Sequence, residues 1–157
     1  MLRFLALFVA TFAFAGPAAA DWEFAKWGMT PDEVIVASGG LAKARTPHAG
    51  RESASVNLVT AIYEAGGIHF RVAFLFSRDD PRLDAVTLTA VDRLQCNTLT
   101  NTLLDRYGRG ERSKSRMLDE YVWRDERNRN HVRYSAVAGS GCSIRYSPLT
   151  SRPAPRP

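Results

Sequence analysis

The sequence predicts an α+β fold made of two tandem helix-plus-three-strand (αβββ) repeats, with antiparallel sheets that share one core. A segment with helix-starting signals is followed by three segments in which apolar and polar residues alternate, and this order occurs twice. The two halves align at an offset of 60 residues, which places Val72 with Val132 and Val86 with Tyr146. Because each half offers one apolar sheet face and one short amphipathic helix, we expect the halves to bury those faces together.

Local signals place the elements of the first half. A helix is expected over 31–38, with Thr30 as its N-cap, Pro31 at its first position and Glu33 completing a capping box. The segment 41–52 is expected to be a loop because it contains proline and glycine. Three strands follow, and their alternating apolar residues are Val56, Leu58 and Ile62, then Ile68, Phe70, Val72, Phe74 and Phe76, then Val86, Leu88 and Ala90.

The second half repeats this order. Its helix is expected over Asn97–Tyr107 and ends at Gly108. The segment 109–116 is expected to be a charged connection. The three strands of this half are marked by Tyr121 and Trp123, by Val132, Tyr134 and Ala136, and by Ile144 and Tyr146.

The first 20 residues have the features of a secretory signal peptide. Arg3 precedes the apolar run Phe4–Ala15, and three alanines at 18–20 form a cleavage site before Asp21. An uncleaved membrane anchor is the alternative, but a spanning helix needs about 20 apolar residues. The run here has 12 residues. The mature protein is therefore expected in the periplasm, without stable insertion in a membrane.

Cleavage leaves 137 of the 157 residues, a length that suits one domain. The predicted organisation is a signal peptide at 1–20, a single domain at 21–147 and a flexible tail rich in proline and arginine at 148–157. Within the domain, the two repeats are expected at 21–92 and 93–147. No cysteine lies near the cleavage site, so the sequence offers no lipid attachment point there.

The only two cysteines, Cys96 and Cys142, are expected to form a disulfide. An isolated pair in an oxidising compartment usually does so. Metal binding or redox chemistry by two thiols is the alternative. Their spacing is not that of a C-x-x-C motif, and no histidine lies at ligand spacing from either cysteine.

The net charge of +5 is carried mainly by arginine. Arginine binds carboxylates and phosphates through two parallel hydrogen bonds. The candidate partner is therefore an anionic component of the cell envelope, such as a wall polymer or lipid phosphates, or a protein. The candidate surface for binding this partner is the segment 106–133, which we call the basic segment. Tyr121 and Trp123 would act as its aromatic anchors. A mixed, solvated surface is the alternative. The nine basic residues of the basic segment are Arg106, Arg109, Arg112, Lys114, Arg116, Arg124, Arg127, Arg129 and Arg133.

The sequence shows no catalytic, cofactor-binding or metal-binding pattern. Its three histidines, His48, His69 and His131, are expected to be solvated residues rather than ligands. Adjacent carboxylates occur in expected turns, and neither a G-x-S-x-G motif nor a glycine-rich phosphate loop is present. We therefore expect no cofactor, and nucleic acid is not an expected partner outside the cytoplasm.

The stretch Gly28-Met29-Thr30-x-x-x-Val34 resembles a helix entry found in two kinds of secreted protein. One is the β-lactamase-inhibitor-protein fold with its tandem helix-plus-sheet repeats, and the other is the small lipoprotein of the outer-membrane barrel assembly machine. The resemblance implies a binding or scaffold protein. A small periplasmic hydrolase or enzyme inhibitor is the alternative function.

Overall fold

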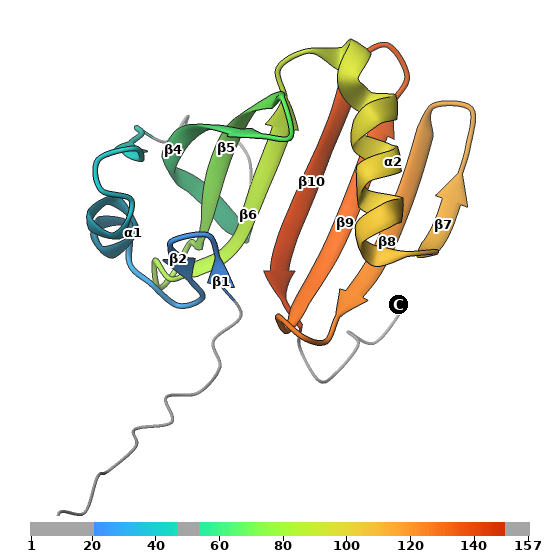
Figure 1. Ribbon diagram of the computed structural model, residues 1–157. Helices are drawn as coiled ribbons and strands as arrows, with labels where there is room; N and C mark the ends of the chain where they lie inside the picture. Colours follow the sequence, from blue (N-terminus) through green and yellow to red (C-terminus); the bar gives the residue numbers. More distant parts are fainter. Residues whose placement is uncertain (1–20, 47–53, 150–157) are drawn as a thin grey trace, which may run out of the picture.

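The computed structural model describes residues 21–46 and 54–149, which form an antiparallel sheet of eight strands with two short helices (Figure 1). The strand order is β3-β4-β5-β6-β10-β9-β8-β7. A separate ribbon of two short strands, β1 and β2, precedes the first helix. The strands are β1 (Asp21–Trp22), β2 (Ala25–Lys26), β3 (Lys43–Ala44), β4 (Ser55–Ala65), β5 (Ile68–Ser77), β6 (Leu83–Ala90), β7 (Glu111–Lys114), β8 (Leu118–Asp125), β9 (Asn130–Val137) and β10 (Gly141–Pro148). The helices are α1 (Pro31–Ala37) and α2 (Cys96–Tyr107), and the 3-10 turn η1 (Arg93–Gln95) leads into α2.

The prediction of two tandem helix-plus-three-strand repeats is wrong. About half of the described chain lies in strands, and eight of these strands form one continuous sheet. At the centre of this sheet β6 pairs directly with β10, and Val86 lies opposite Tyr146. The offset of 60 assigns these two residues to equivalent places in separate halves, yet they are neighbours. Alternating apolar residues identify a strand, but they do not identify the strand beside it.

The sequence also misses the two edge strands of the sheet. Strand β3 lies in the segment 41–52, where a loop is expected, and β7 lies in the charged connection 109–116. Every side chain of both strands is exposed, so neither strand has the apolar alternation on which the prediction depends. Short or charged edge strands discourage pairing with another chain, which explains why a natural sheet ends in them.

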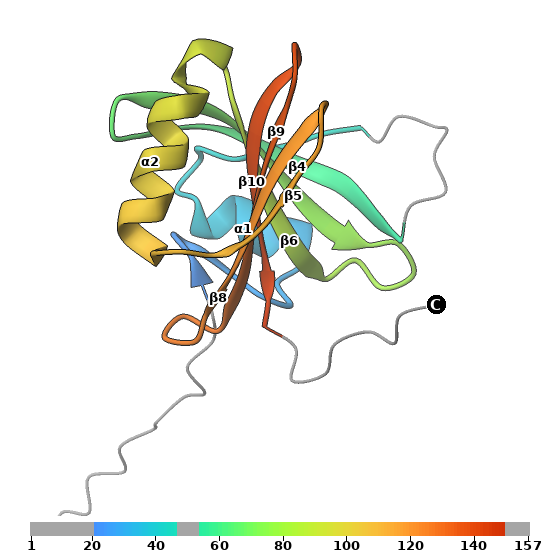
Figure 2. The ribbon, with the colours of Figure 1, turned by 90° about the vertical axis from the view of Figure 1, so that its right-hand side faces the viewer.

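One face of the sheet is buried. On the inner strands, Phe70, Phe74 and Ile144 are at most 3% exposed. Helix α2 packs on this face over β8, β9 and β10 through its buried residues Leu99 and Leu103 (Figures 1 and 2). The N-terminal ribbon covers the β4–β5 part of the same face through an aromatic cluster. Helix α1 lies beside β4 and adds Val34, which is 0% exposed, to the same core. The core therefore lies between the sheet and these three covers.

The predicted helix ends are nearly correct. Thr30 caps α1, and Glu33 completes the capping box, with its carboxylate 2.7 Å from the Thr30 backbone nitrogen. These hydrogen bonds lower the pKa of Glu33. Helix α2 begins at Cys96, one residue before its expected start, and is followed by Gly108 with a φ of 71°, a conformation that favours glycine.

Cys96 and Cys142 form the predicted disulfide, with an S–S distance of 2.04 Å. The bridge joins the first residue of α2 to β10. It therefore ties the helix that covers the buried face to a strand at the centre of the sheet.

The predicted signal peptide at 1–20 lies outside the described residues, as do 47–53 and the part of the tail after 149. Strand β10 extends to Pro148, the first residue of the expected tail. Among the described helices, none has the length and apolar character that crossing a bilayer requires.

Candidate functional site

The fold does not bring His69 and His131 together. His48 lies outside the described residues. His69, near the start of β5, has its Nδ1 atom 3.3 Å from Glu64 Oε2, and both side chains are largely exposed. His131 lies on β9, three strands away in the sheet order. Within 21–46 and 54–149, no group of three or more His, Cys, Asp or Glu side chains is arranged to hold a metal ion.

We expect His131 to make stability depend on pH. Burial, followed by the charges of Arg133 and Arg124, lowers its pKa below the ordinary value of 6.5. The unfolded chain therefore takes up this proton more readily than the folded protein. The stabilising contribution is complete above the unfolded pKa and is lost as the pH falls through the folded pKa.

Urea unfolding at about pH 8 and about pH 5.5 measures this dependence. We expect the free energy of unfolding to be smaller at the lower pH, and this loss to shrink in His131→Gln. An equal loss in the variant would show that another group is responsible.

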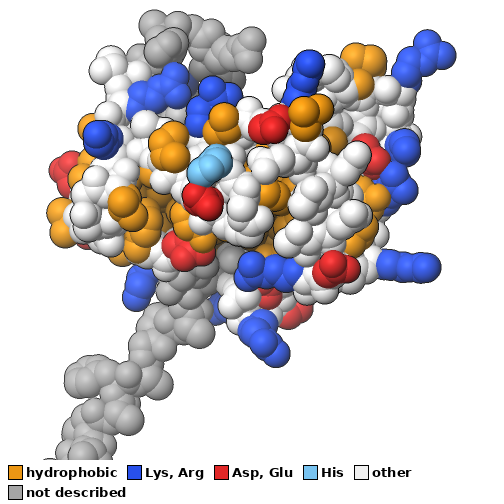
Figure 3. Space-filling view, turned by 45° about the horizontal axis from the view of Figure 1, so that its top comes forward, with side chains coloured by type: hydrophobic (Ala, Val, Ile, Leu, Met, Phe, Trp, Pro, Cys, Tyr) orange, Lys and Arg blue, Asp and Glu red, His pale blue; other side chains and the backbone are white. Residues whose placement is uncertain are grey.

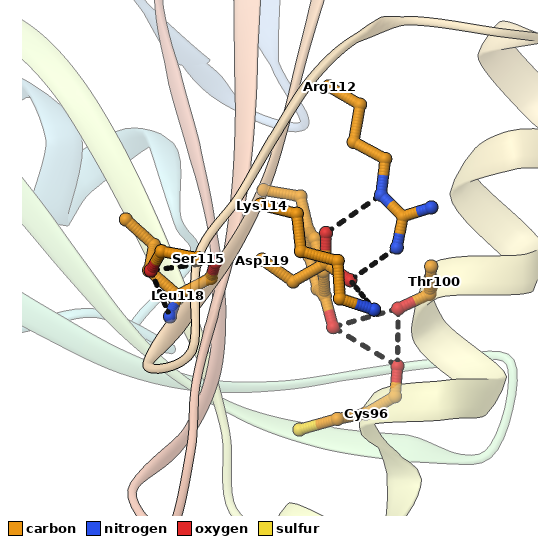
Figure 4. A network of polar contacts seen from close by, with 8 residues as sticks. Cys96, Thr100, Arg112, Lys114, Ser115, Leu118 and Asp119 are labelled. Carbon is orange, nitrogen blue, oxygen red and sulfur yellow. Dashed lines mark hydrogen bonds and ion pairs between the residues drawn. The ribbon is translucent and has the colours of Figure 1, made fainter.

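The basic segment is divided between different parts of the surface. Arg112 donates to Asp119 through Nε and Nη2, at 2.9 and 2.7 Å, and Lys114 lies 3.9 Å from the same carboxylate (Figure 4). The hydrogen bonds from Arg112 lower the pKa of Asp119. The expected anchors Tyr121 and Trp123 are 8% and 5% exposed, so a partner cannot reach them. In Figure 3, Lys and Arg side chains are interspersed with acidic and hydrophobic ones rather than gathered in one patch.

A small polar network holds the start of α2 on the sheet (Figure 4). The hydroxyl oxygens of Thr100 and Tyr134 lie 2.8 Å apart. They lie 2.8 and 3.2 Å, respectively, from the carbonyl oxygen of Cys96. Burial raises the pKa of the Tyr134 hydroxyl, which therefore stays protonated and can donate. This network positions the helix and leaves no reactive group free.

A cavity of about 240 Å³ lies between α2, the N-terminal ribbon and the buried face of the sheet. Its floor is apolar and comes from β5, β6 and β10, and one wall comes from α2. The side chains of this apolar part are Trp22, Ile68, Phe70, Leu88, Leu99, Leu103 and Ile144. A space of this size is many times larger than a single water molecule needs, and its lining suits an apolar ligand.

Charged side chains gather at the rim of the cavity. Glu23 accepts a hydrogen bond of 2.8 Å from the Tyr63 hydroxyl, and Asp125 accepts two hydrogen bonds within the β8–β9 turn. The Arg106 guanidinium lies over the Tyr107 ring, 5.2 Å from its centroid. It makes no hydrogen bond or ion pair with any residue that the structure describes. Among the charged groups of the rim, Arg106 is therefore the one with donors to offer a ligand.

The polar part of the lining also includes two tyrosine hydroxyls. Burial raises the pKa of both Tyr63 and Tyr146. Both hydroxyls therefore stay protonated at neutral pH. Glu23, in the tight turn between β1 and β2, has a φ of 52°. Such two-residue hairpin turns require positive φ, and here the turn places a carboxylate at the rim where glycine is the usual residue.

Sequence patterns missed this cavity because its lining comes from segments far apart in the chain. One signal was present. Arg106 follows Leu103 by three residues and Leu99 by seven, which places it on the same side of the helix as the two buried leucines. A charged residue on the same side of a helix as its buried apolar residues indicates a polar site at the end of that buried surface.

Comparison with known proteins found no relative of this chain. It matches no family model, no curated protein and no solved structure. The resemblance based on the Gly28-Met29-Thr30 helix entry therefore stays a prediction.

Proposed function

We propose that this chain is an exported, periplasmic binding protein that holds a small amphipathic ligand in the cavity beneath α2. The ligand's apolar body would lie on the floor, and its polar head would reach Arg106. The observation that carries the proposal is an apolar cavity of about 240 Å³ whose rim holds a guanidinium without a hydrogen bond or ion pair to any described residue. Ligand sites commonly combine a mostly apolar lining with a few polar groups that orient the ligand.

The charges of the rim narrow the ligand class. Glu23 and Asp125 flank the site and repel a multiply charged anion, whereas Arg106 can bind one carboxylate through two parallel hydrogen bonds. The volume is below the range of about 300–1,000 Å³ that is typical of drug-sized ligands. A short acyl chain or a single aromatic ring with one carboxylate fits both limits.

The observed lining favours binding over hydrolysis. Nucleophilic catalysis needs a nucleophile with an adjacent base. The described residues around the cavity include no histidine, serine or cysteine. Tyr63 donates to the Glu23 carboxylate, but burial and this hydrogen bond raise the pKa of its hydroxyl, which makes it a poor nucleophile. The polar groups around the cavity are instead arranged to orient a ligand.

The proposal is tested by calorimetric titration of the mature, oxidised protein with octanoate, decanoate and 3-phenylpropanoate, and with the matching alcohols. We expect saturable binding of at least one of the acids. Arg106→Gln is expected to weaken acid binding about tenfold or more, because a hydrogen bond to a charged group is lost, and to change alcohol binding little. Leu103→Trp fills the cavity and is expected to abolish both.

Arg116→Gln provides the matched control, since it removes an exposed charge that lies outside the cavity lining. Equal effects of Arg106→Gln and Arg116→Gln would contradict the assigned role of Arg106. Absence of saturable binding for every acid and alcohol would contradict the proposed function.

A further inference from the structure

The second face of the central strands carries a group of basic side chains. In the antiparallel register Arg145 on β10 lies directly opposite Arg133 on β9, and His131 on β9 lies directly opposite Arg124 on β8. Arg133 and His131 are two residues apart on one strand, so all four side chains share a face. We call these residues the open-face basic cluster. Figure 2 shows α2 along the other side of these strands.

Placing two arginines opposite each other is unfavourable for folding. Like charges on directly paired residues destabilise a sheet, and β9 and β10 are both interior strands, so the pair cannot turn away at an edge. Nearby carboxylates compensate only in part. Arg133 Nη1 lies 3.8 Å from Glu120 Oε2, and Arg124 Nε lies 3.1 Å from Glu126 Oε1.

Arg145 makes no ion pair or hydrogen bond with any residue in the described part of the chain. It is nevertheless half-buried in the middle of the sheet, where its direct neighbours are Thr87 on one side and Arg133 on the other. A local arrangement that opposes folding without a compensating contact is typical of a functional site. An anionic group between Arg145 and Arg133 would supply the missing compensation.

Small hydroxyl side chains surround the open-face basic cluster. Ser147 lies opposite His131, and Ser143 lies between Ser135 and Thr89. Ser135 donates to Glu120 at 3.2 Å, while no hydrogen bond from Ser143 or Ser147 side chains to another described residue is present. Short side chains let a ligand approach the sheet closely, and free hydroxyl groups can both donate and accept hydrogen bonds.

We propose that this face binds an acidic polysaccharide that crosses β10, β9 and β8. Paired strands are about 5 Å apart, and successive side chains on one face of a strand are about 7 Å apart. Arg145 and Arg133 are directly opposite each other, and Arg124 on β8 lies one step further along, so the three guanidinium groups form a diagonal array across three strands. An extended polymer with a carboxylate on each sugar can place negative charges along this array, while its hydroxyl groups meet the serine and threonine side chains. The proposal is independent of the cavity, which opens on the opposite face.

An acidic peptide fits this face less well. Peptides recognise sheets chiefly by pairing with a free strand edge or by inserting apolar side chains into pockets. Both β9 and β10 are paired on both sides, and Tyr121 and Trp123 point to the other face. Recognition here must therefore use charge and hydroxyl groups.

The test measures binding of fluorescent alginate oligomers to the mature, oxidised protein, with dextran and polyglutamate of similar length as comparisons. We expect alginate to bind most tightly, dextran not to bind, and alginate affinity to fall as sodium chloride is raised. The double variant Arg133→Gln/Arg145→Gln is expected to bind alginate about tenfold or more weakly. Arg93→Gln/Arg116→Gln removes the same charge elsewhere and is expected to change affinity by less than about threefold.

A second readout separates a binding role from a structural one. If the paired arginines serve a ligand, Arg133→Gln/Arg145→Gln removes a repulsion and its urea midpoint is equal to or above that of the parent protein. A lower midpoint would assign the arginines a structural role and overturn the proposal. Equal loss of alginate binding in both double variants, tighter binding of polyglutamate, or absence of alginate binding at low salt would also overturn it.

Discussion

Loss of the Cys96–Cys142 disulfide is expected to lower the free energy of unfolding by about 4 kcal/mol. The bridge spans a sequence separation of 46 residues, and in the chain-entropy model its effect comes from restricting the unfolded chain. The native position of α2 has further support, because Thr100 and Tyr134 bind the carbonyl of Cys96. We therefore expect the reduced protein to stay folded while its stability falls.

The measurement compares urea unfolding of the oxidised protein, the protein in reductant, and Cys96→Ser/Cys142→Ser. Since the sequence has only two cysteines, reductant has no other target in this chain. Both altered forms are expected to unfold at lower urea concentration with an unchanged native far-UV circular dichroism spectrum. An unchanged midpoint would show that the bridge contributes nothing to stability, and a collapsed native spectrum would show that α2 depends on it.

Local structure was predictable where the physical cause is local. The capping box of Thr30 and Glu33 marks the start of α1, because both hydrogen bonds join residues three apart. The strand expected to start at Ile68 from alternation alone is β5, Ile68–Ser77. The number of cysteines and the expected oxidising compartment likewise predict the observed disulfide, since two cysteines in one chain allow a single pairing.

The arrangement of the strands was not predictable from the same signals. Pairing of β6 with β10 joins residues that are far apart in sequence, and nothing in either strand's own pattern specifies the other. The order along the chain, a helix followed by strands, therefore suggested two repeats where the structure has one continuous sheet. Strands β3 and β7 are not predicted, because all their side chains face solvent and show no apolar alternation.

The same limit explains which parts of the candidate sites were missed. The cavity depends on tertiary contacts between the N-terminal ribbon, α2 and three strands. The basic segment contained Arg124 and Arg133, but Arg145 lies outside it and becomes their neighbour only through the register of β9 with β10. Tyr121 and Trp123 are predicted as accessible anchors but are buried, because alternation does not say which of two faces is covered.

Phe74→Ala is expected to destabilise the protein by about 3–5 kcal/mol, the usual cost of removing a fully buried phenylalanine side chain. Phe74 is 0% exposed at the centre of β5. Its ring centroid lies 5.7 Å from that of Trp22 and 5.9 Å from that of Phe24. The N-terminal ribbon therefore packs on Phe74. The loss of stability in Phe74→Ala therefore includes the loss of these aromatic contacts in addition to the loss of buried apolar area.

Ile62→Ala is the matched control, because Ile62 lies on the neighbouring strand β4 but is 68% exposed. We expect it to change the free energy of unfolding by less than about 0.5 kcal/mol. Urea unfolding followed by tryptophan fluorescence measures both variants.

Since Trp22 also lines the cavity, Phe74→Ala is expected to weaken binding of the amphipathic acids even under conditions where it is folded. Among the described residues of the sheet, Phe74 is the one whose ring contacts both Trp22 and Phe24. If Phe74→Ala were as stable as Ile62→Ala, the packing of the ribbon on β5 would be contradicted.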